Sequence, residues 1–183
     1  MFARTRRLLL RPGFPEDAPA LTASIADEAV VRNLSGPPWP FHVRDAEAYL
    51  ARARDPLLPC LLIFLRTDAA PQLIGECGLA RRASGSVEMG YWIARSYWSR
   101  GFATEACTAL VDIARTIGLA RLEASHFLDN PASARVLEKL GFEPTGLVAP
   151  RMSCARGTEV HARLMRLELR CDECGGEDEA LAA

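Results

Sequence analysis

The chain has 183 residues, of which 49% are hydrophobic and 25% charged, with a formal net charge of −1. These values are typical of one globular domain, and the balance of 22 basic against 23 acidic residues argues against a broad nucleic-acid interface. Nowhere do about 18 uncharged apolar residues follow one another, so we expect a cytoplasmic protein with neither a membrane nor a nucleic-acid partner.

Hydrophobic periodicity and turn residues predict one domain over residues 1–171, followed by an acidic, disordered tail over residues 172–183. Strand-like hairpins alternate with strand–helix–strand units, and this order favours an α/β mixed sheet with helices on both faces. The predicted elements, in chain order, are a strand at 7–11, helices at 16–34 and 43–54, strands at 60–66, 72–82 and 86–94, a helix at 103–117, a strand at 122–128, a helix at 131–140, and strands at 141–148 and 160–170.

The six cysteines agree with a reducing compartment. Cys171 and Cys174 form a Cys-x-x-Cys pair, but a tetrahedral zinc site needs four ligands, so we expect no metal. A zinc or disulfide link between two molecules is the alternative for this pair. The other four stand singly in apolar segments, where a free thiol acts as a small hydrophobic group: Cys60, Cys77, Cys107 and Cys154.

The segment Trp98-Ser-Arg-Gly-Phe-Ala103 joins a predicted strand to the helix that follows. The first N–H groups of a helix have no partner within it, and the helix dipole adds partial positive charge there. Gly101 and Ala103 would let an anion approach the main chain, and Arg100 would add a full charge. The segment therefore predicts a phosphate-binding helix start, although the same pattern also opens helices that bind no ligand.

A second signature, Asn130 to Phe142, follows one strand later. Together with Glu88 to Trp92 and Arg100 to Glu105, it resembles the GNAT superfamily of acyl-CoA-dependent N-acetyltransferases, and most closely the RimJ/RimL-like branch. The resemblance runs along nearly the whole chain and stops before the tail. It implies a mostly antiparallel sheet with one splayed parallel strand pair. It also implies an enzyme that transfers an acetyl group from acetyl-CoA directly to a primary amine of a protein N-terminus or small molecule, as a monomer or homodimer.

The resemblance also assigns residues to the cosubstrate. Trp98 departs from the Gln or Arg that begins the phosphate loop in the family. Leu137 stands where many members carry a tyrosine that protonates the departing thiolate, so Ser133 is expected to contact the sulfur and to act in catalysis. The residues expected to hold acetyl-CoA are Trp92, Ile93, Ala94, Arg100, Gly101, Phe102, Ala103, Thr104, Asn130 and Ser133.

The reaction needs a base, because a lysine-like amine of pKa near 10.4 costs about 4.6 kcal/mol to deprotonate at pH 7, whereas an α-amine near 7.8 costs about 1 kcal/mol. Glu88 lies near the position of the catalytic glutamate in histone-acetylating relatives and is the main candidate. The alternative is an ion pair with Arg81 or Arg82 across the hairpin. Glu123 and His126, on the next strand, are the other candidates, each with a purely structural alternative.

Arg32, Trp39 and Phe41 occupy the region that shapes the acceptor pocket in this superfamily. Packing of a loop aromatic on its own domain, and a solvated helix end, explain them equally well. The second function considered is a non-catalytic acyl-CoA-binding module that acts as a sensor or in assembly. Leu137 and Trp98 favour that alternative, whereas Glu88 beside an intact phosphate loop favours the enzyme.

Overall fold

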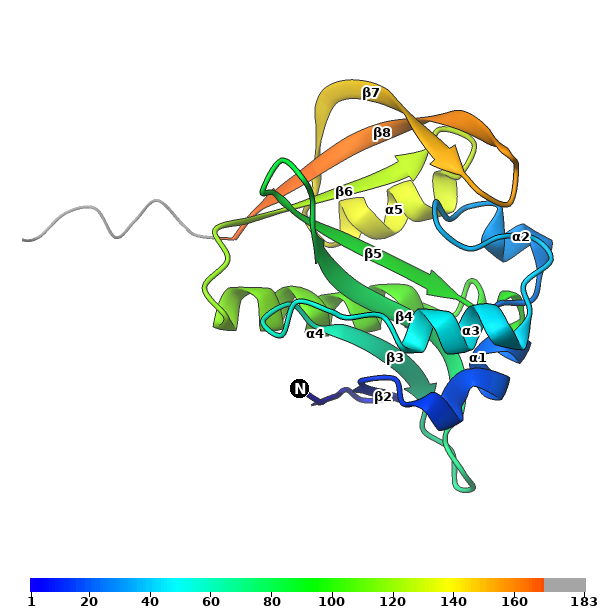
Figure 1. Ribbon diagram of the computed structural model, residues 1–183. Helices are drawn as coiled ribbons and strands as arrows, with labels where there is room; N and C mark the ends of the chain where they lie inside the picture. Colours follow the sequence, from blue (N-terminus) through cyan, green and yellow to red (C-terminus); the bar gives the residue numbers. More distant parts are fainter. Residues whose placement is uncertain (170–183) are drawn as a thin grey trace, which may run out of the picture.

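An eight-stranded sheet forms the centre of residues 1–169, which are the residues that the computed structural model describes (Figure 1). The strand order is β1-β2-β3-β4-β5-β6-β8-β7. All neighbours are antiparallel except β5 and β6, which are parallel. The strands are β1 (Ala3–Arg4), β2 (Leu8–Arg11), β3 (Cys60–Leu65), β4 (Gln72–Arg81), β5 (Val87–Ile93), β6 (Arg121–Phe127), β7 (Glu143–Ser153) and β8 (Thr158–Glu168).

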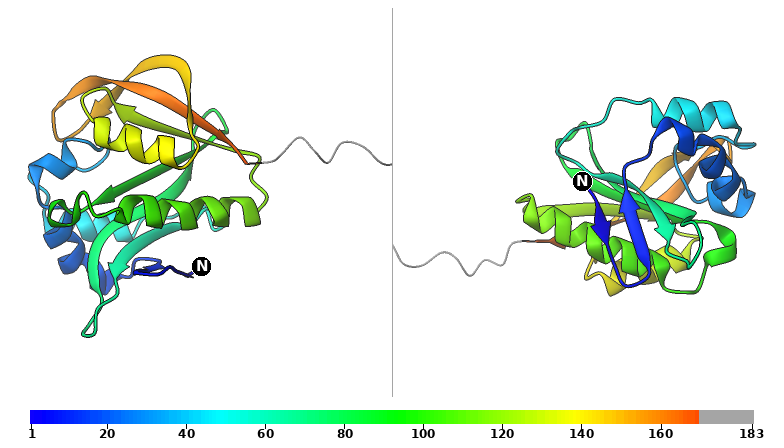
Figure 2. Two further views of the ribbon diagram at one scale, coloured as in Figure 1. Left: turned by 180° about the vertical axis from the view of Figure 1, so that it is seen from behind. Right: turned by 90° about the horizontal axis from the view of Figure 1, so that it is seen from below.

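Helices cover both faces of the sheet, as the sequence predicted. Two views show α4 and α5 on one face and α1 and α3 on the other, with α2 beside the end of β5 (Figures 1 and 2). Short 3-10 turns, η1 and η2, precede α1 and follow β5. The bounds are η1 (Pro15–Asp17), α1 (Ala18–Ile25), α2 (Glu28–Val31), α3 (Val43–Leu50), η2 (Arg95–Tyr97), α4 (Phe102–Thr116) and α5 (Pro131–Lys139).

Strand β5 separates two hydrophobic cores. Its side chains alternate between the faces, so Met89 and Ile93 pack in the core beneath α4, while Trp92 packs in the core beneath α1 and α3. Glu88 and Gly90 share the face of Trp92. This alternation, which the sequence predicted, places polar Glu88 and Gly90, which has no side chain, on the same face as buried Trp92.

The parallel pairing of β5 with β6 is very short. It joins Glu88 to Glu123 and Met89 to Ala124, and beyond these residues the two strands diverge (Figure 1). The residues of β5 from Gly90 onward therefore keep β4 as a neighbour on one side only. The splayed parallel pair that the resemblance implied is present.

Several expected bounds were wrong. The predicted helix over residues 16–34 is interrupted between α1 and α2, because Asp27 is extended (φ −138°) and its carboxylate caps Ala29 N at 2.8 Å. Strand β1 was not predicted, and β7 begins at Glu143 and extends to Ser153. Gly141, with φ +87°, ends the preceding helix before that strand.

The cysteines within residues 1–169 are free thiols. Cys77 and Cys107 are buried and Cys60 is partly buried, but Cys154 is exposed, so the expected apolar surroundings were wrong for it. Cys171, Cys174 and the tail over 172–183 lie outside the described residues. None of the helices in residues 1–169 is both long enough and apolar enough to span a bilayer.

Candidate active site

A cavity of about 1050 Å³ opens where β5 and β6 separate. One arm runs between β5, β6, α5 and the start of α4. A second arm lies on the other face of the sheet, over β4 and β5, and is bordered by the end of α3 and the loop after it. The two arms are continuous, so two ligands bound from opposite faces can meet at β5.

The open edge of β5 offers main-chain groups to the first arm. Ala94 N donates to Ile74 O on β4 at 2.8 Å, so by antiparallel alternation the N–H and C=O of Tyr91 and Ile93 point toward β6. Trp98 Nε1 donates to Ile93 O at 2.7 Å. The unexpected tryptophan of the phosphate loop thus fixes the loop to the strand end.

The start of α4 has the form of an anion cradle. Gly101, with φ +77°, is its N-cap and supplies no side-chain cap, and Ser99 has φ +60°. The N–H groups of the first helical turn therefore have no partner within the helix, and Phe102, Ala103 and Thr104 line the cavity. Alternating backbone of this kind forms anion-binding concavities.

Arg100 is placed differently from the expectation that it lines the phosphate site. Its guanidinium lies 5.6 Å from the Tyr97 ring centroid, and within residues 1–169 the cavity lining does not include it. The side chain is exposed and long, so its charge remains near the cradle rather than in it.

Arg7 braces the phosphate loop from the first hairpin, which the sequence reasoning did not identify. Its Nη1 donates to Arg100 O at 3.0 Å, and its Nε donates to Glu105 Oε2 at 2.6 Å. The guanidinium also lies 4.3 Å from the Phe102 ring centroid. Burial would raise the pKa of Glu105, but bonds from Thr5 and Arg7 outweigh it and lower the pKa. The helix start is therefore held from a distant segment.

Asn130 and Ser133 lie at the start of α5 and line the cavity. Asn130 Oδ1 accepts from Ser133 N at 3.2 Å, which leaves its amide nitrogen without a bond within the described residues. Ser133 Oγ lies 2.8 Å from Tyr91 Oη, and burial raises the pKa of Tyr91, so that hydroxyl stays protonated. Leu137, 1% exposed, closes the wall behind them.

Glu88 lines the cavity but is heavily engaged. Arg82 Nε bonds to its Oε2, Ser125 Oγ donates to its Oε1 at 2.8 Å, and Arg151 Nη2 lies 3.8 Å from Oε2. Burial alone would raise its pKa, but the bonds from Arg82 and Ser125 and the charge of Arg151 lower it. The Arg82 pair that the alternative interpretation predicted is therefore present.

The two rival bases, Glu123 and His126, each have a partner of their own. Glu123 accepts from Ser86 Oγ at 2.7 Å, and the cavity lining within residues 1–169 does not include it. His126 does line the cavity, and its Nδ1 lies 3.0 Å from Phe127 O. A main-chain contact of this kind agrees with the structural alternative for this histidine.

The three predicted acceptor residues are not gathered at the cavity. Phe41, 8% exposed, packs in the core beneath α1 and α3, and Trp39 is 39% exposed in the loop before α3. Arg32 Nη2 lies 3.5 Å from Asp129 Oδ2. In the described part of the chain none of the three lines the cavity, whereas Asn33 and Leu34 do.

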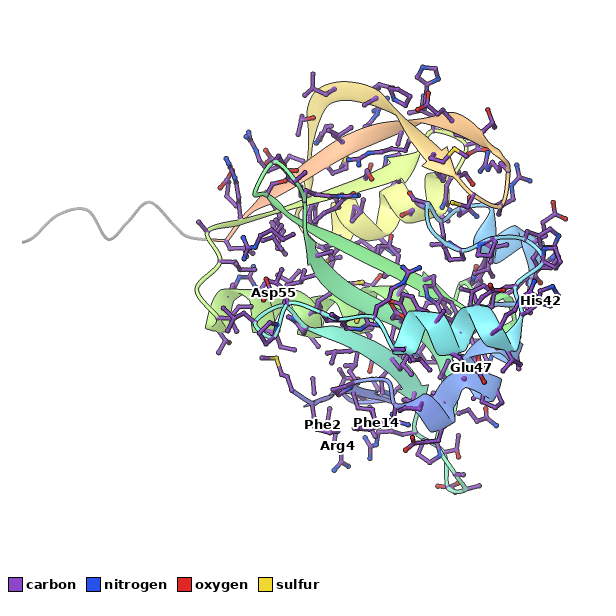
Figure 3. All side chains as sticks on the ribbon, viewed as in Figure 1. Phe2, Arg4, Phe14, His42, Glu47 and Asp55 are labelled. Atoms are coloured by element: carbon purple, nitrogen blue, oxygen red, sulfur yellow. The ribbon has the colours of Figure 1, made fainter. Side chains whose placement is uncertain are left out.

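A second carboxylate at the cavity was missed by sequence reasoning. Glu76 on β4 receives bonds on Oε1 from Tyr49 Oη and, at 3.4 Å, from Cys60 Sγ. Arg54 contacts the sulfur of Cys60, and all four side chains line the second arm. Asp55, labelled in Figure 3, pairs with Arg81 at 3.6 Å, and both residues also line the cavity.

A family model for the acetyltransferase (GNAT) domain matches residues 7–143. The uncharacterized N-acetyltransferase p20 of Bacillus licheniformis is 32% identical over 152 residues, which are 79% of this chain and 83% of that protein. An acetyltransferase structure from Agrobacterium tumefaciens is 26% identical with a TM-score of 0.71, covering 92% of this chain and 94% of the other. RimL, a ribosomal L7/L12 α-N-protein acetyltransferase solved with coenzyme A, is 17% identical with a TM-score of 0.76, covering 92% and 98%. The splayed strand pair, the helix cradle and these likenesses agree, and the chain belongs to the GNAT family of acetyltransferases.

Proposed function

We propose that the protein is an acetyl-CoA-dependent N-acetyltransferase that carries the acetyl group directly to a primary amine, of a protein N-terminus or of a small molecule, in a ternary complex. The observation that carries this proposal is the continuity of the cavity. A strand edge and helix start suited to a phosphorylated, strand-like cosubstrate open into an arm that the carboxylates of Glu76 and Glu88 line.

The residues fit coenzyme A on structural grounds. Gly101 has a positive φ at the cradle, a backbone conformation that would strain any residue with a side chain. The first N–H groups of α4 have no acceptor within the helix and no side-chain cap. The N–H and C=O groups of Tyr91 and the N–H of Ile93 supply the strand edge for an amide-bearing arm, since Ile93 O already accepts from Trp98 Nε1. Acetyl-CoA bound there would supply the activated acyl group, and Asn130 and Ser133 would contact its arm from α5.

The acceptor enters over Gly90, on the arm that the carboxylates of Glu76 and Glu88 line. Glu88 is the candidate base that the resemblance implies. Ser133 and Tyr91 form the hydroxyl pair on the opposite face. Two separate points support an amine at a protein N-terminus as one acceptor class. RimL, a structural neighbour, is an α-N-protein acetyltransferase. An α-amine is also easier to deprotonate near neutral pH than a lysine side chain. We place the reaction in the cytoplasm, where free thiols remain reduced.

A thiol-release assay tests the function. Purified protein and acetyl-CoA are incubated with peptide N-termini, lysine peptides, polyamines, aminoglycosides and free amino acids, and a reaction without amine measures background hydrolysis. We expect amine-dependent thiol release with at least one class, and mass spectrometry should show one added acetyl group on that amine. Coenzyme A binding with no turnover on the whole panel would instead favour a non-catalytic acyl-CoA-binding module.

A further inference from the structure

Two paired glycines leave part of the floor of the second arm without side chains. Gly78 on β4 lies opposite Gly90 on β5, and a Cβ at Gly90 would meet nothing within 4 Å. Glu76 and Glu88 stand on the same face at either side of this glycine pair. Glu88 is two residues from Gly90 along β5, about 7 Å, and Glu76 is its diagonal neighbour across β4, about 7–8 Å between Cα atoms. An amine resting on Gly90 therefore lies between two glutamates whose Cα atoms are similarly distant from it.

The two carboxylates differ in what already occupies them. Both oxygens of Glu88 are engaged, one by Ser125 and the other by Arg82 with Arg151 nearby. A proton placed on Glu88 would break an ion pair. Its three partners tie β5 to β6, to the β4–β5 turn and to β7, so its geometry is that of a brace.

Glu76 has one engaged oxygen and one open oxygen. Oε1 receives the bonds from Tyr49 and Cys60, and Oε2 makes no bond within the described residues. Every buried side-chain oxygen in that part of the chain has a hydrogen-bond partner, so Oε2 must be accessible from the cavity that Glu76 lines. The carboxylate is thus held at one oxygen and free to accept at the other.

The two donors keep their protons. Burial and the neighbouring Glu76 charge raise the pKa of Cys60 to about 12, and the same two causes raise the pKa of Tyr49. Burial also raises the pKa of Glu76, and the bonds from Tyr49 and Cys60 and the charge of Arg54 offset only part of that rise. A carboxylate with a raised pKa is a stronger base, and it is closer in proton affinity to an α-amine than an ordinary glutamate is.

We propose that Glu76 binds the ammonium group of the acceptor and takes its proton, while Tyr49 and Cys60 position the carboxylate and Glu88 braces the strands. This proposal rests on the proposed function and deepens it. The first proton moves from the ammonium nitrogen to Glu76 Oε2, and the freed amine attacks the thioester carbonyl to form the C–N bond. The C–S bond then breaks. The nitrogen loses its second proton, which passes through water or the Ser133 and Tyr91 hydroxyls to the leaving thiolate, and Glu76 returns its proton to solvent.

The test compares three matched variants, Glu76→Gln, Glu88→Gln and Glu123→Gln. Glutamine at 76 keeps an oxygen to accept from Tyr49 and Cys60. For an amine that wild type acetylates, we expect Glu76→Gln to lower kcat/KM by about 10²- to 10³-fold and to remove the acidic limb of its pH profile. Coenzyme A affinity should stay within twofold by calorimetry. Glu123→Gln, outside the cavity, should retain wild-type rates.

Two kinetic results would overturn the assignment: Glu76→Gln that keeps at least a third of wild-type kcat/KM, or Glu88→Gln that loses as much kcat/KM as we expect for Glu76→Gln while circular dichroism shows that its fold is retained. Calorimetric titration of the coenzyme A-loaded protein with the same amines gives a readout without turnover. We expect wild type to bind an amine at least tenfold more tightly than Glu76→Gln does. Equal binding, or no binding of any amine by wild type, also overturns it. Amine binding without thiol release would contradict the proposed function and leave the ammonium site standing.

Discussion

Glu76 and Glu88 have the same side chain on the same sheet face, but their surroundings shift their pKa values in opposite directions. Arginine and serine donors lower the pKa of Glu88 against the effect of burial, whereas burial dominates at Glu76 and raises its pKa. The difference lies in the nearest donors. Guanidinium groups stabilise the charged form strongly, and a phenol and a thiol do so less.

We predict opposite effects of the two glutamine variants on stability. Glu88 has a folded pKa below its unfolded value, so its contribution is present above the unfolded pKa and is lost as pH falls through the folded one. Glu88→Gln should therefore lower the free energy of unfolding by about 1–3 kcal/mol at pH 7, since it removes charged hydrogen bonds, and by less at pH 4. Urea unfolding at both pH values measures this.

Glu76 provides the comparison. Its folded pKa is raised, so the folded state is favoured below the unfolded pKa and loses that advantage as pH rises through the folded one. Glu76→Gln should thus be at least as stable as wild type at pH 7. The same stability loss in both variants would contradict the two environments described.

The Ser133 and Tyr91 hydroxyls are the candidate proton donors to the departing thiolate, because Leu137, at the position where many family members carry a tyrosine, has no hydroxyl. We predict that Ser133→Ala lowers kcat by about 10- to 100-fold, toward the lower end of general-acid effects, because Tyr91 or water partly substitutes for it. Tyr91→Phe, which removes a single oxygen, should lower kcat less. Steady-state rates and calorimetric acetyl-CoA affinity separate the two effects. An unaltered rate in Ser133→Ala would reject the sulfur contact.

At the scale of single residues, the sequence predicted the sites that lie within one local motif. It missed the site that forms only when two strands pair. Ser133 and Gly101 lie in contiguous signatures, so their neighbourhood could be predicted. Glu76 could not be found that way, because its importance comes from pairing β4 with β5. One signal was available: Glu76-x-Gly78 and Glu88-x-Gly90 repeat the same Glu-x-Gly pattern on two consecutive strands.

At the scale of elements, the start of α4 depends on a segment almost a hundred residues away. Arg7 ties the hairpin β1–β2 to Glu105 and to the loop carbonyl of Arg100. The sequence predicted the helix and its glycine, because helix starts follow local rules. It could not predict the brace, since nothing near Arg7 in the chain shows which helix will face it.

Gly101 and Gly118 give a matched test of the cradle. Both have a positive φ, +77° and +79°, so alanine at either position should cost about 1–2 kcal/mol of stability. Gly101→Ala should also weaken coenzyme A binding by at least about tenfold, because its Cβ stands at the cradle and 3.6 Å from Arg7 Nη2. Calorimetric titration and urea unfolding measure the two effects. Equal coenzyme A affinities in both variants would show that Gly101 serves the fold alone.

For the whole molecule, the order of elements and the mixed sheet could be predicted from hydrophobic periodicity, and the splayed pair from the resemblance. The break at Asp27 and the packing of Phe41 in the core could not. The break comes from the extended backbone of Asp27 and its cap of Ala29 N, which interrupt the helical spacing. The burial of Phe41 depends on tertiary contacts that place a loop aromatic in the core. The sequence-based prediction was least accurate for the residues between α1 and α3, where the loops show no hydrophobic periodicity.

Because the cosubstrate site spans β5, α4 and α5, its occupation should stabilise the whole domain. At 100 times its Kd, a ligand that binds only the folded state adds about 2.7 kcal/mol. For a chain of this size we predict a rise in Tm of about 5 to 10 °C with acetyl-CoA. Differential scanning fluorimetry measures it, with Gly101→Ala at the same ligand concentration as the control. A shift of the same size in that variant would argue against binding at the cradle.

The short pairing of β5 with β6 has a consequence for how the protein avoids association. An unpaired strand edge on the outside of a sheet can recruit strands of other chains and lead to aggregation. Here the free edge of β5 lies inside the molecule, between β6 and the cavity wall of α5. A slender chain of amides and methylene groups has no side chains to place beside that edge, whereas a second polypeptide strand would also have to fit its side chains against β6 and α5. The fold thereby keeps a reactive edge available to one small ligand and shields it from neighbouring proteins.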